Sequence, residues 1–133
     1  MNDLKIKETV ENLIDTFLEA GKISLELRNK GLIKKIKSDN TPVSNGDLEV
    51  NKIVTKKLLK LTPEIPIVSE ETSHNKSVKN LENFWLVDPI DGTYDYINNL
   101  DEFTINAGLI INRKAFAGLI YAPAKNRMFY TFG

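Results

Sequence analysis

The amino-acid sequence predicts an α+β fold in which two N-terminal helices pack on a mostly antiparallel sheet. Up to residue 61, apolar residues recur every three or four positions, which is the period of an amphipathic helix. Beyond residue 64 they form short runs bounded by turn residues, as in strands. Short polar connections join the last three runs, and this favours an antiparallel meander near the C-terminus.

The first helix is expected to be long and amphipathic and to end at Gly31. Its apolar face would hold Ile6, Val10, Leu13, Ile14, Phe17 and Leu18. Residues 37–42 are dense in turn formers and predict a polar loop. A second helix should begin near Asp47, and Pro63 and Pro66 mark its end. The apolar face of this helix would hold Val50, Ile53, Val54, Leu58 and Leu61.

Five later segments are expected to be strands. They are residues 65–69, 84–87, 103–111, 115–121 and 128–132. A loop with a helical turn is expected over residues 72–83, and short connections over 112–114 and 123–127. The last strand would form an exposed sheet edge unless something covers it, so we expect a missing continuation. Residues 1–133 are treated as one domain.

The composition narrows the function classes. Lys+Arg and Asp+Glu balance at 18 each, so the net charge favours no nucleic acid polymer as a partner. The chain has no cysteine, which excludes a disulfide framework, a thiolate metal site and a cysteine nucleophile. No signal peptide and no apolar run of membrane-spanning length are visible. We therefore expect a cytoplasmic protein, with peripheral attachment at the inner membrane as the alternative.

One apolar strand leads into the residues that carry most chemical information. Asp88 stands at its C-terminal end, Pro89 is expected to fix a turn, and Asp91 follows three residues after Asp88. Gly92 allows a close backbone approach, and Thr93 can cap the following segment. Two carboxylates on so short a turn suit a hard cation such as Mg²⁺. If a helix begins here, its free amide groups would bind an anion beside the metal.

The acidic pair has three other possible interpretations. Asp88 and Asp91 could instead stabilise a turn through Asx-type hydrogen bonds. An EF-hand loop that starts at Asp88 fails, because Ile90 and Gly92 would occupy its third and fifth positions. A haloacid-dehalogenase-type site needs the two acids one residue apart, whereas two residues separate this pair.

Two further acidic positions are candidates for the same site. Glu70 and Glu71 follow an apolar strand, and one of the two should face the site. Asp47 at the start of the second helix is either an ordinary helix N-cap or a functional carboxylate. His74 lies in a polar stretch, where a solvated loop histidine is the favoured interpretation.

Together these motifs resemble the inositol monophosphatase superfamily. The matching segments are residues 39–44 before Asp47, 69–71 and 88–93, with 102–106 and 121–123 similar to the bacterial CysQ type of 3′(2′),5′-bisphosphate nucleotidase. The resemblance implies the N-terminal half of a layered α/β sandwich. The C-terminal half of the family, with its tryptophan–aspartate motif, has no counterpart here. The chain also departs from this pattern: Tyr94-Asp95-Tyr96 replaces the lysine–glutamate–phenylalanine usual in the CysQ branch, and Asn45-Gly46 stands where small alanine-type residues are common.

The resemblance implies a metal site. Its ligands would be the carboxylates of Glu70, Asp88 and Asp91 and the backbone carbonyl of Ile90, with Asp88 bridging two ions. The implied cofactor is Mg²⁺, roughly two or three ions, for which Mn²⁺ substitutes and at which Li⁺ inhibits. Thr93 and Asp47 would orient and deprotonate the attacking water, and the amides of Gly92 and Thr93 would hold the phosphate.

The function that the resemblance implies is magnesium-dependent hydrolysis of a small phosphomonoester, with 3′-phosphoadenosine 5′-phosphate as the expected substrate. One alternative is an inositol monophosphatase. Another is a truncated, catalytically weak or inactive metal-binding fragment, or one chain of a split enzyme. The expected partners are a small phosphorylated substrate and either a second copy of the chain or a complementing C-terminal chain.

Overall fold

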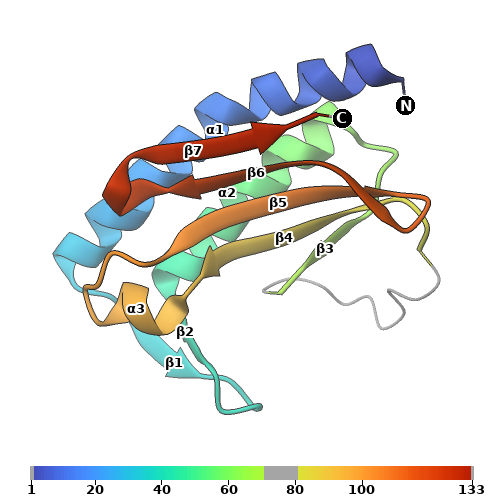
Figure 1. The fold of residues 1–133 in the computed structure, drawn as a ribbon. Coiled ribbons are helices and arrows are strands. Elements are labelled where there is room, and N and C mark those ends of the chain that lie inside the picture. Colours follow the sequence, from blue (N-terminus) through green and yellow to red (C-terminus); the bar gives the residue numbers. More distant parts are fainter. Residues whose placement is uncertain (1, 71–80, 133) are drawn as a thin grey trace.

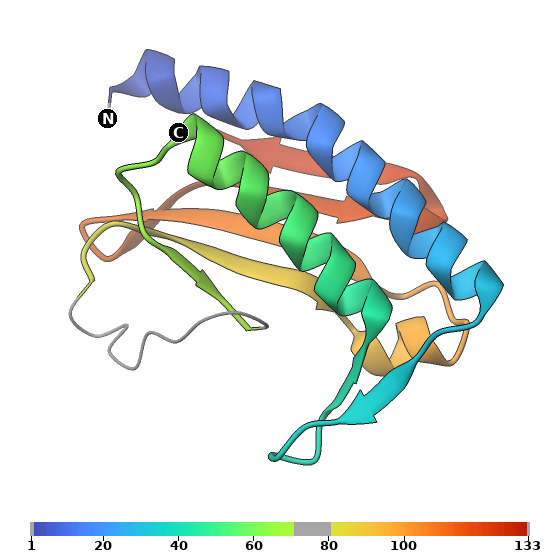
Figure 2. The ribbon, with the colours of Figure 1, turned by 180° about the vertical axis from the view of Figure 1, so that it is seen from behind.

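The protein folds into a layer of helices on a layer of strands, and its computed structural model describes residues 2–70 and 81–132. The helices of the described part are α1 (Asp3–Lys30), α2 (Asn45–Leu61), the short α3 (Thr93–Ile97) and a 3-10 turn (Pro123–Lys125). A five-stranded sheet has, in spatial order, β3 (Ile67–Ser69), β4 (Phe84–Asp91), β5 (Thr104–Ile111), β6 (Lys114–Ala122) and β7 (Arg127–Thr131). Helices α1 and α2 lie side by side on one face of this sheet (Figure 1 and Figure 2). The predicted α+β fold is confirmed.

Helix α1 follows the predicted pattern closely. Asn2 caps its N-terminus by accepting a 2.8 Å hydrogen bond from the amide of Lys5. Gly31 ends the helix with φ at 97°, a value that glycine adopts without strain. The prediction for Leu18 was wrong, because this side chain is 42% exposed. It follows Phe17, which is fully buried, and adjacent helix positions point about 100° apart.

Helix α2 begins two residues before Asp47, the predicted start. Ser44 is its N-cap, so Asp47 is the third residue of the helix and not the cap. A small two-stranded sheet that was not predicted precedes it, formed by β1 (Lys34–Ile36) and β2 (Pro42–Ser44). The predicted polar loop forms the connection between these two strands.

The main sheet is an antiparallel meander from β4 to β7, with β3 added parallel to β4. Strand β4 is longer than predicted and passes through Pro89 to Asp91, so the predicted turn at Pro89 was wrong. The register with β5 shifts between Asp88 and Asp91. A proline lacks an N–H group, and an irregular stretch of this kind tolerates that loss.

The core lies between the two helices and the sheet. Trp85 is fully buried there, and its Nε1 donates a 3.0 Å hydrogen bond to Oγ1 of Thr62, the residue after α2. The main apolar contributors from α1 and α2 are Val10, Leu13, Phe17, Val50, Val54 and Leu58. No helix of the described residues combines the length and the apolar character needed to cross a membrane.

Candidate functional site

The C-terminal ends of β3 and β4 bring the predicted acidic residues to one end of the sheet. These strands run parallel with Ser69 paired to Val87, and Glu70 and Asp88 are the residues that follow this pair along the two chains. The amide of Glu70 donates to the carbonyl of Val87 at 3.4 Å and so continues the ladder. Asp91 is exposed at the end of β4, where the irregular pairing with β5 between Asp88 and Asp91 ends.

The end of β3 is held against α2 by buried polar groups. Ser69 Oγ donates a hydrogen bond to Oδ1 of Asn51, and both residues are only 1% exposed. A buried hydrogen bond of this kind is costly to break, because water does not replace it in the interior. It fixes the backbone immediately before Glu70.

Asp47 and Thr93 meet across 46 residues of sequence. Thr93 Oγ1 lies 2.8 Å from Oδ1 of Asp47 and 3.1 Å from the carbonyl oxygen of Ile90. A hydroxyl group has one proton, so it donates to one of these acceptors at a time, and a bond to a carboxylate is the stronger. When Thr93 donates to Asp47, the lone pairs of its hydroxyl remain available as acceptors.

Ser44 orients the Asp47 carboxylate. Its amide and its hydroxyl donate to Oδ2 of Asp47 at 2.8 and 2.6 Å, and the amide of Asp47 donates back to Oγ of Ser44 at 3.3 Å. This is a capping box, and it leaves Oδ1 directed at Thr93. Asp47 is only 1% exposed. Sequence reasoning missed the role of Ser44, although the spacing Ser-x-x-Asp at a helix start was visible.

Gly92 forms the link between β4 and α3. Its φ of 90° and ψ of 42° lie in the left-handed region. A Cβ atom at this position would lie 2.7 Å from the carbonyl oxygen of Glu102, so the chain passes too close for a side chain. Gly92 is the N-cap of α3 without a side-chain bond. The expected capping by Thr93 was therefore wrong, since its hydroxyl reaches Asp47 instead.

The residue types fit Mg²⁺, but the described residues do not form a complete metal cluster. Carboxylate and carbonyl oxygens are the ligands that this cation takes. Within residues 2–70 and 81–132, no group of three acidic, histidine or cysteine side chains is arranged to hold a metal ion. Asn106 pairs in register with Asp88, and its buried Oδ1 has no hydrogen-bond partner among the described residues. This oxygen supports a binding site beside Asp88 that a further ligand or chain completes. Glu71 and His74 lie outside the described part.

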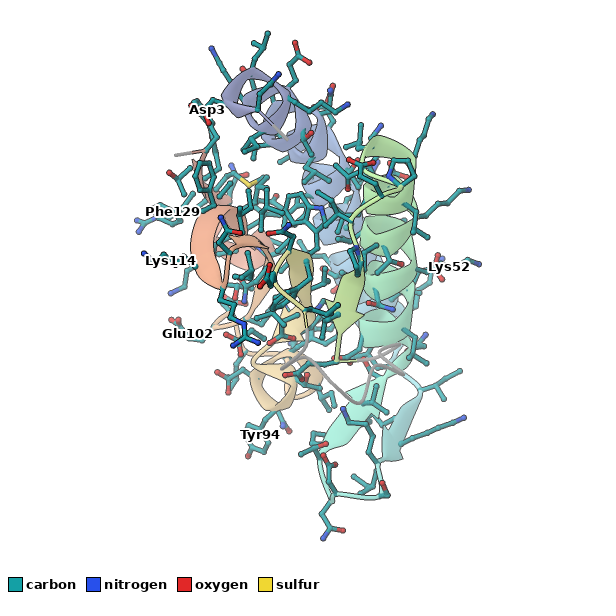
Figure 3. All side chains as sticks on the ribbon, turned by 90° about the vertical axis from the view of Figure 1, so that its right-hand side faces the viewer. Asp3, Lys52, Tyr94, Glu102, Lys114 and Phe129 are labelled. Carbon is teal, nitrogen blue, oxygen red and sulfur yellow. The ribbon has the colours of Figure 1, made fainter. Side chains whose placement is uncertain are left out.

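The sheet face opposite the helices is apolar and hollowed. A groove of about 570 Å³ runs over β4 to β7, with Asp88 at its margin and Gly108 paired to Gly118 on its floor. The large hydrophobic side chains exposed along it are Leu86, Ile120, Phe129 and Tyr130. Figure 3 shows Phe129 projecting on one side of the molecule and Lys52 of α2 on the other. The groove includes Asp88 but not Glu70, Asp91 or Thr93, so it meets the acidic strand ends at Asp88.

Comparisons with known proteins assign the family. The model of the inositol monophosphatase family matches residues 6–132. The 3′(2′),5′-bisphosphate nucleotidase CysQ of Haemophilus influenzae is 36% identical over 84% of this chain and 42% of its own length.

Solved structures agree with this assignment. CysQ from Bacteroides thetaiotaomicron aligns with a TM-score of 0.69 at 27% identity, covering 94% of this chain and 46% of its own. An IMPase/NADP phosphatase complexed with Mg²⁺ and phosphate aligns with a TM-score of 0.77 at 20% identity, over 94% and 48% of the two chains, and so shares the fold. The chain spans less than half the length of these three relatives. It belongs to the inositol monophosphatase family.

Proposed function

We propose that this chain carries the N-terminal part of a magnesium-dependent phosphomonoesterase site whose substrate is 3′-phosphoadenosine 5′-phosphate. The observation that carries the proposal is the 2.8 Å hydrogen bond from Thr93 to buried Asp47. A relative that is 36% identical to this chain is a 3′(2′),5′-bisphosphate nucleotidase, and this supports the choice of substrate. The metal ligands remain a prediction: Glu70, Asp88, Asp91 and the carbonyl of Ile90.

The chain's own residues would handle the proton and the phosphate. Thr93 donates its proton to Asp47 while its oxygen accepts the proton of the attacking water, so the net transfer is from water to the carboxylate. Ser44 keeps the carboxylate in position for this transfer. The first-turn amides at Gly92 and Thr93 would hold the phosphate oxygens. Bound Mg²⁺ would lower the pKa of the water that it binds and neutralise charge on the phosphoryl group.

The open sheet face supports a complementing chain as the partner. The groove over β4 to β7 is apolar, and Leu86 and Ile120 are each 48% exposed on it. Contiguous exposed apolar patches on soluble proteins commonly mark interfaces. We propose that the second half of the family fold, on the same or a separate polypeptide, covers this face and completes the site beside Asp88.

Phosphate release tests this function. The chain is incubated with Mg²⁺ and 3′-phosphoadenosine 5′-phosphate, alone and together with a separately produced C-terminal half of the Haemophilus influenzae relative. Release in either sample that disappears in Asp91→Asn supports the proposal. If size-exclusion chromatography shows a complex and neither sample releases phosphate, the chain is an inactive metal-binding fragment instead.

An inositol monophosphatase is the second candidate. It is supported by the family model that matches residues 6–132, which is that of the inositol monophosphatase family. The curated relative at 36% identity is a 3′(2′),5′-bisphosphate nucleotidase and favours the first candidate. Faster release from inositol 1-phosphate than from 3′-phosphoadenosine 5′-phosphate in the same assay would select this candidate.

A further inference from the structure

A second contact joins α3 to the first turn of α2, next to the Asp47–Thr93 pair. Gly46 is buried against the ring of Tyr96. A Cβ atom on Gly46 would lie 2.1 Å from Oη of Tyr96 and 2.7 Å from its Cε2 and Cζ atoms. Separations this short do not occur in folded proteins, so the first turn of α2 approaches this ring only because residue 46 has no side chain.

Tyr96 is fixed on its other sides. It is fully buried, and its hydroxyl donates a 2.6 Å hydrogen bond to the carbonyl of Ser24 in α1. Its ring centroid lies 4.9 Å from that of Phe103 in a tilted arrangement, and the guanidinium of Arg28 lies 5.6 Å from the ring centroid. These contacts hold the ring in place against a larger residue at position 46.

The position of this contact links it to the site. Gly46 immediately precedes Asp47, and Tyr96 lies three residues after Thr93 on the same side of α3. The amide of Tyr96 also donates to the carbonyl of Gly92 at 2.9 Å, which ties the ring to the turn that presents Thr93. The packing of Gly46 on Tyr96 thus sets how closely α3 approaches α2, and with it the distance between Thr93 and Asp47.

We infer that Gly46 and Tyr96 are a coupled pair of positioning residues for the Asp47–Thr93 hydrogen bond. The space left by the missing Cβ is filled by the Tyr96 hydroxyl, so the two residues depend on each other. The catalytic meaning of the pair rests on the proposed function, but the coupling itself does not.

Thermal unfolding of Gly46→Ala, Tyr96→Phe and the double variant tests the coupling. Overpacking should make Gly46→Ala lower the melting temperature by roughly 4–10 °C in the wild-type background. In the Tyr96→Phe background the ring has lost the atom nearest to the added Cβ and its bond to Ser24, but it keeps Cε2 and Cζ at 2.7 Å, so the same change should cost less without becoming neutral. Gly108→Ala is the control, because a Cβ there meets nothing within 4 Å.

Two results would overturn the coupling. One is an equal loss from Gly46→Ala in both backgrounds, and the other is a double variant that fails to fold while Tyr96→Phe folds. A Gly46→Ala protein that does not fold, together with a double variant that does, supports it.

The positioning role needs its own measurement. Thr93→Val removes the hydroxyl and nearly keeps the shape of the side chain. The fall in melting temperature that it causes is measured in the Tyr96→Phe variant and in the double variant, and the two values are compared. Since the added Cβ displaces α3 from Asp47, the cost should be smaller in the double variant. An equal cost would mean that the pair is structural and positions nothing. Neither comparison measures phosphate release, so a failure here is distinct from a failure of the proposed function.

Discussion

Removal of the Ser44 hydroxyl is the perturbation whose effect follows most directly from the structure. Ser44→Ala deletes the helix cap of α2 and one of the hydrogen bonds that hold Oδ2 of Asp47. Loss of a serine cap costs about 0.5–2 kcal/mol. A hydrogen bond to a charged group contributes about 1.5–3 kcal/mol. The two values describe overlapping interactions, so we expect a loss of about 2 kcal/mol in the free energy of unfolding.

This free energy converts into a measurable shift. For a chain of 133 residues the entropy of unfolding is about 0.28 kcal/mol per kelvin, from about 2.1 cal/mol/K per residue. The melting temperature of Ser44→Ala, followed by circular dichroism, should therefore fall by about 7 °C. Ser38→Ala is the matched control, because Ser38 lies exposed in the turn between β1 and β2. A shift in Ser44→Ala no larger than that of the control would refute the capping-box argument.

Three further predictions concern a core hydrogen bond, a tyrosine and a metal ligand. Thr62→Val leaves the buried indole N–H of Trp85 without an acceptor and should lower the melting temperature by about 4–10 °C, whereas Thr55→Val, whose hydroxyl only donates within α2, should change it little. Burial raises the pKa of Tyr96 above that of an unfolded tyrosine, so its stabilisation is complete below pH 10 and is lost as the pH rises further. The melting temperature of the wild type should thus fall more steeply above pH 10 than that of Tyr96→Phe, and parallel curves would contradict this. Asp91→Asn should weaken Mn²⁺ binding in calorimetry by about tenfold or more, and unchanged affinity would remove Asp91 from the ligand set.

Local pattern was sufficient to predict most of the fold. The three- and four-residue spacing in α1 and α2 determines which side faces the sheet, because only one side is continuously apolar. Likewise, the tight connection at Asn112 and Arg113, both with positive φ, joins β5 to β6 as expected. The parallel pairing of β3 with β4 was not predicted, since a strand's sequence does not specify which neighbour it joins. The strands β1 and β2 have three residues each, too few to show an alternating pattern.

The candidate site depends more on tertiary structure. The contact between Asp47 and Thr93 has no local signature, and only the family resemblance suggested it. The role of Ser44 was encoded locally in its spacing to Asp47. The dependence of Gly46 on Tyr96 could not be predicted, because it arises where two helices distant in sequence meet.

The coordination of a divalent cation is the most direct test of the central claim. Crystals of the protein are soaked in Mn²⁺, and its anomalous scattering locates each bound ion. We expect ions coordinated by carboxylate oxygens of Glu70, Asp88 and Asp91 at the ends of β3 and β4. Mn²⁺ bound only elsewhere, or none at these three carboxylates at saturating concentration, would contradict it.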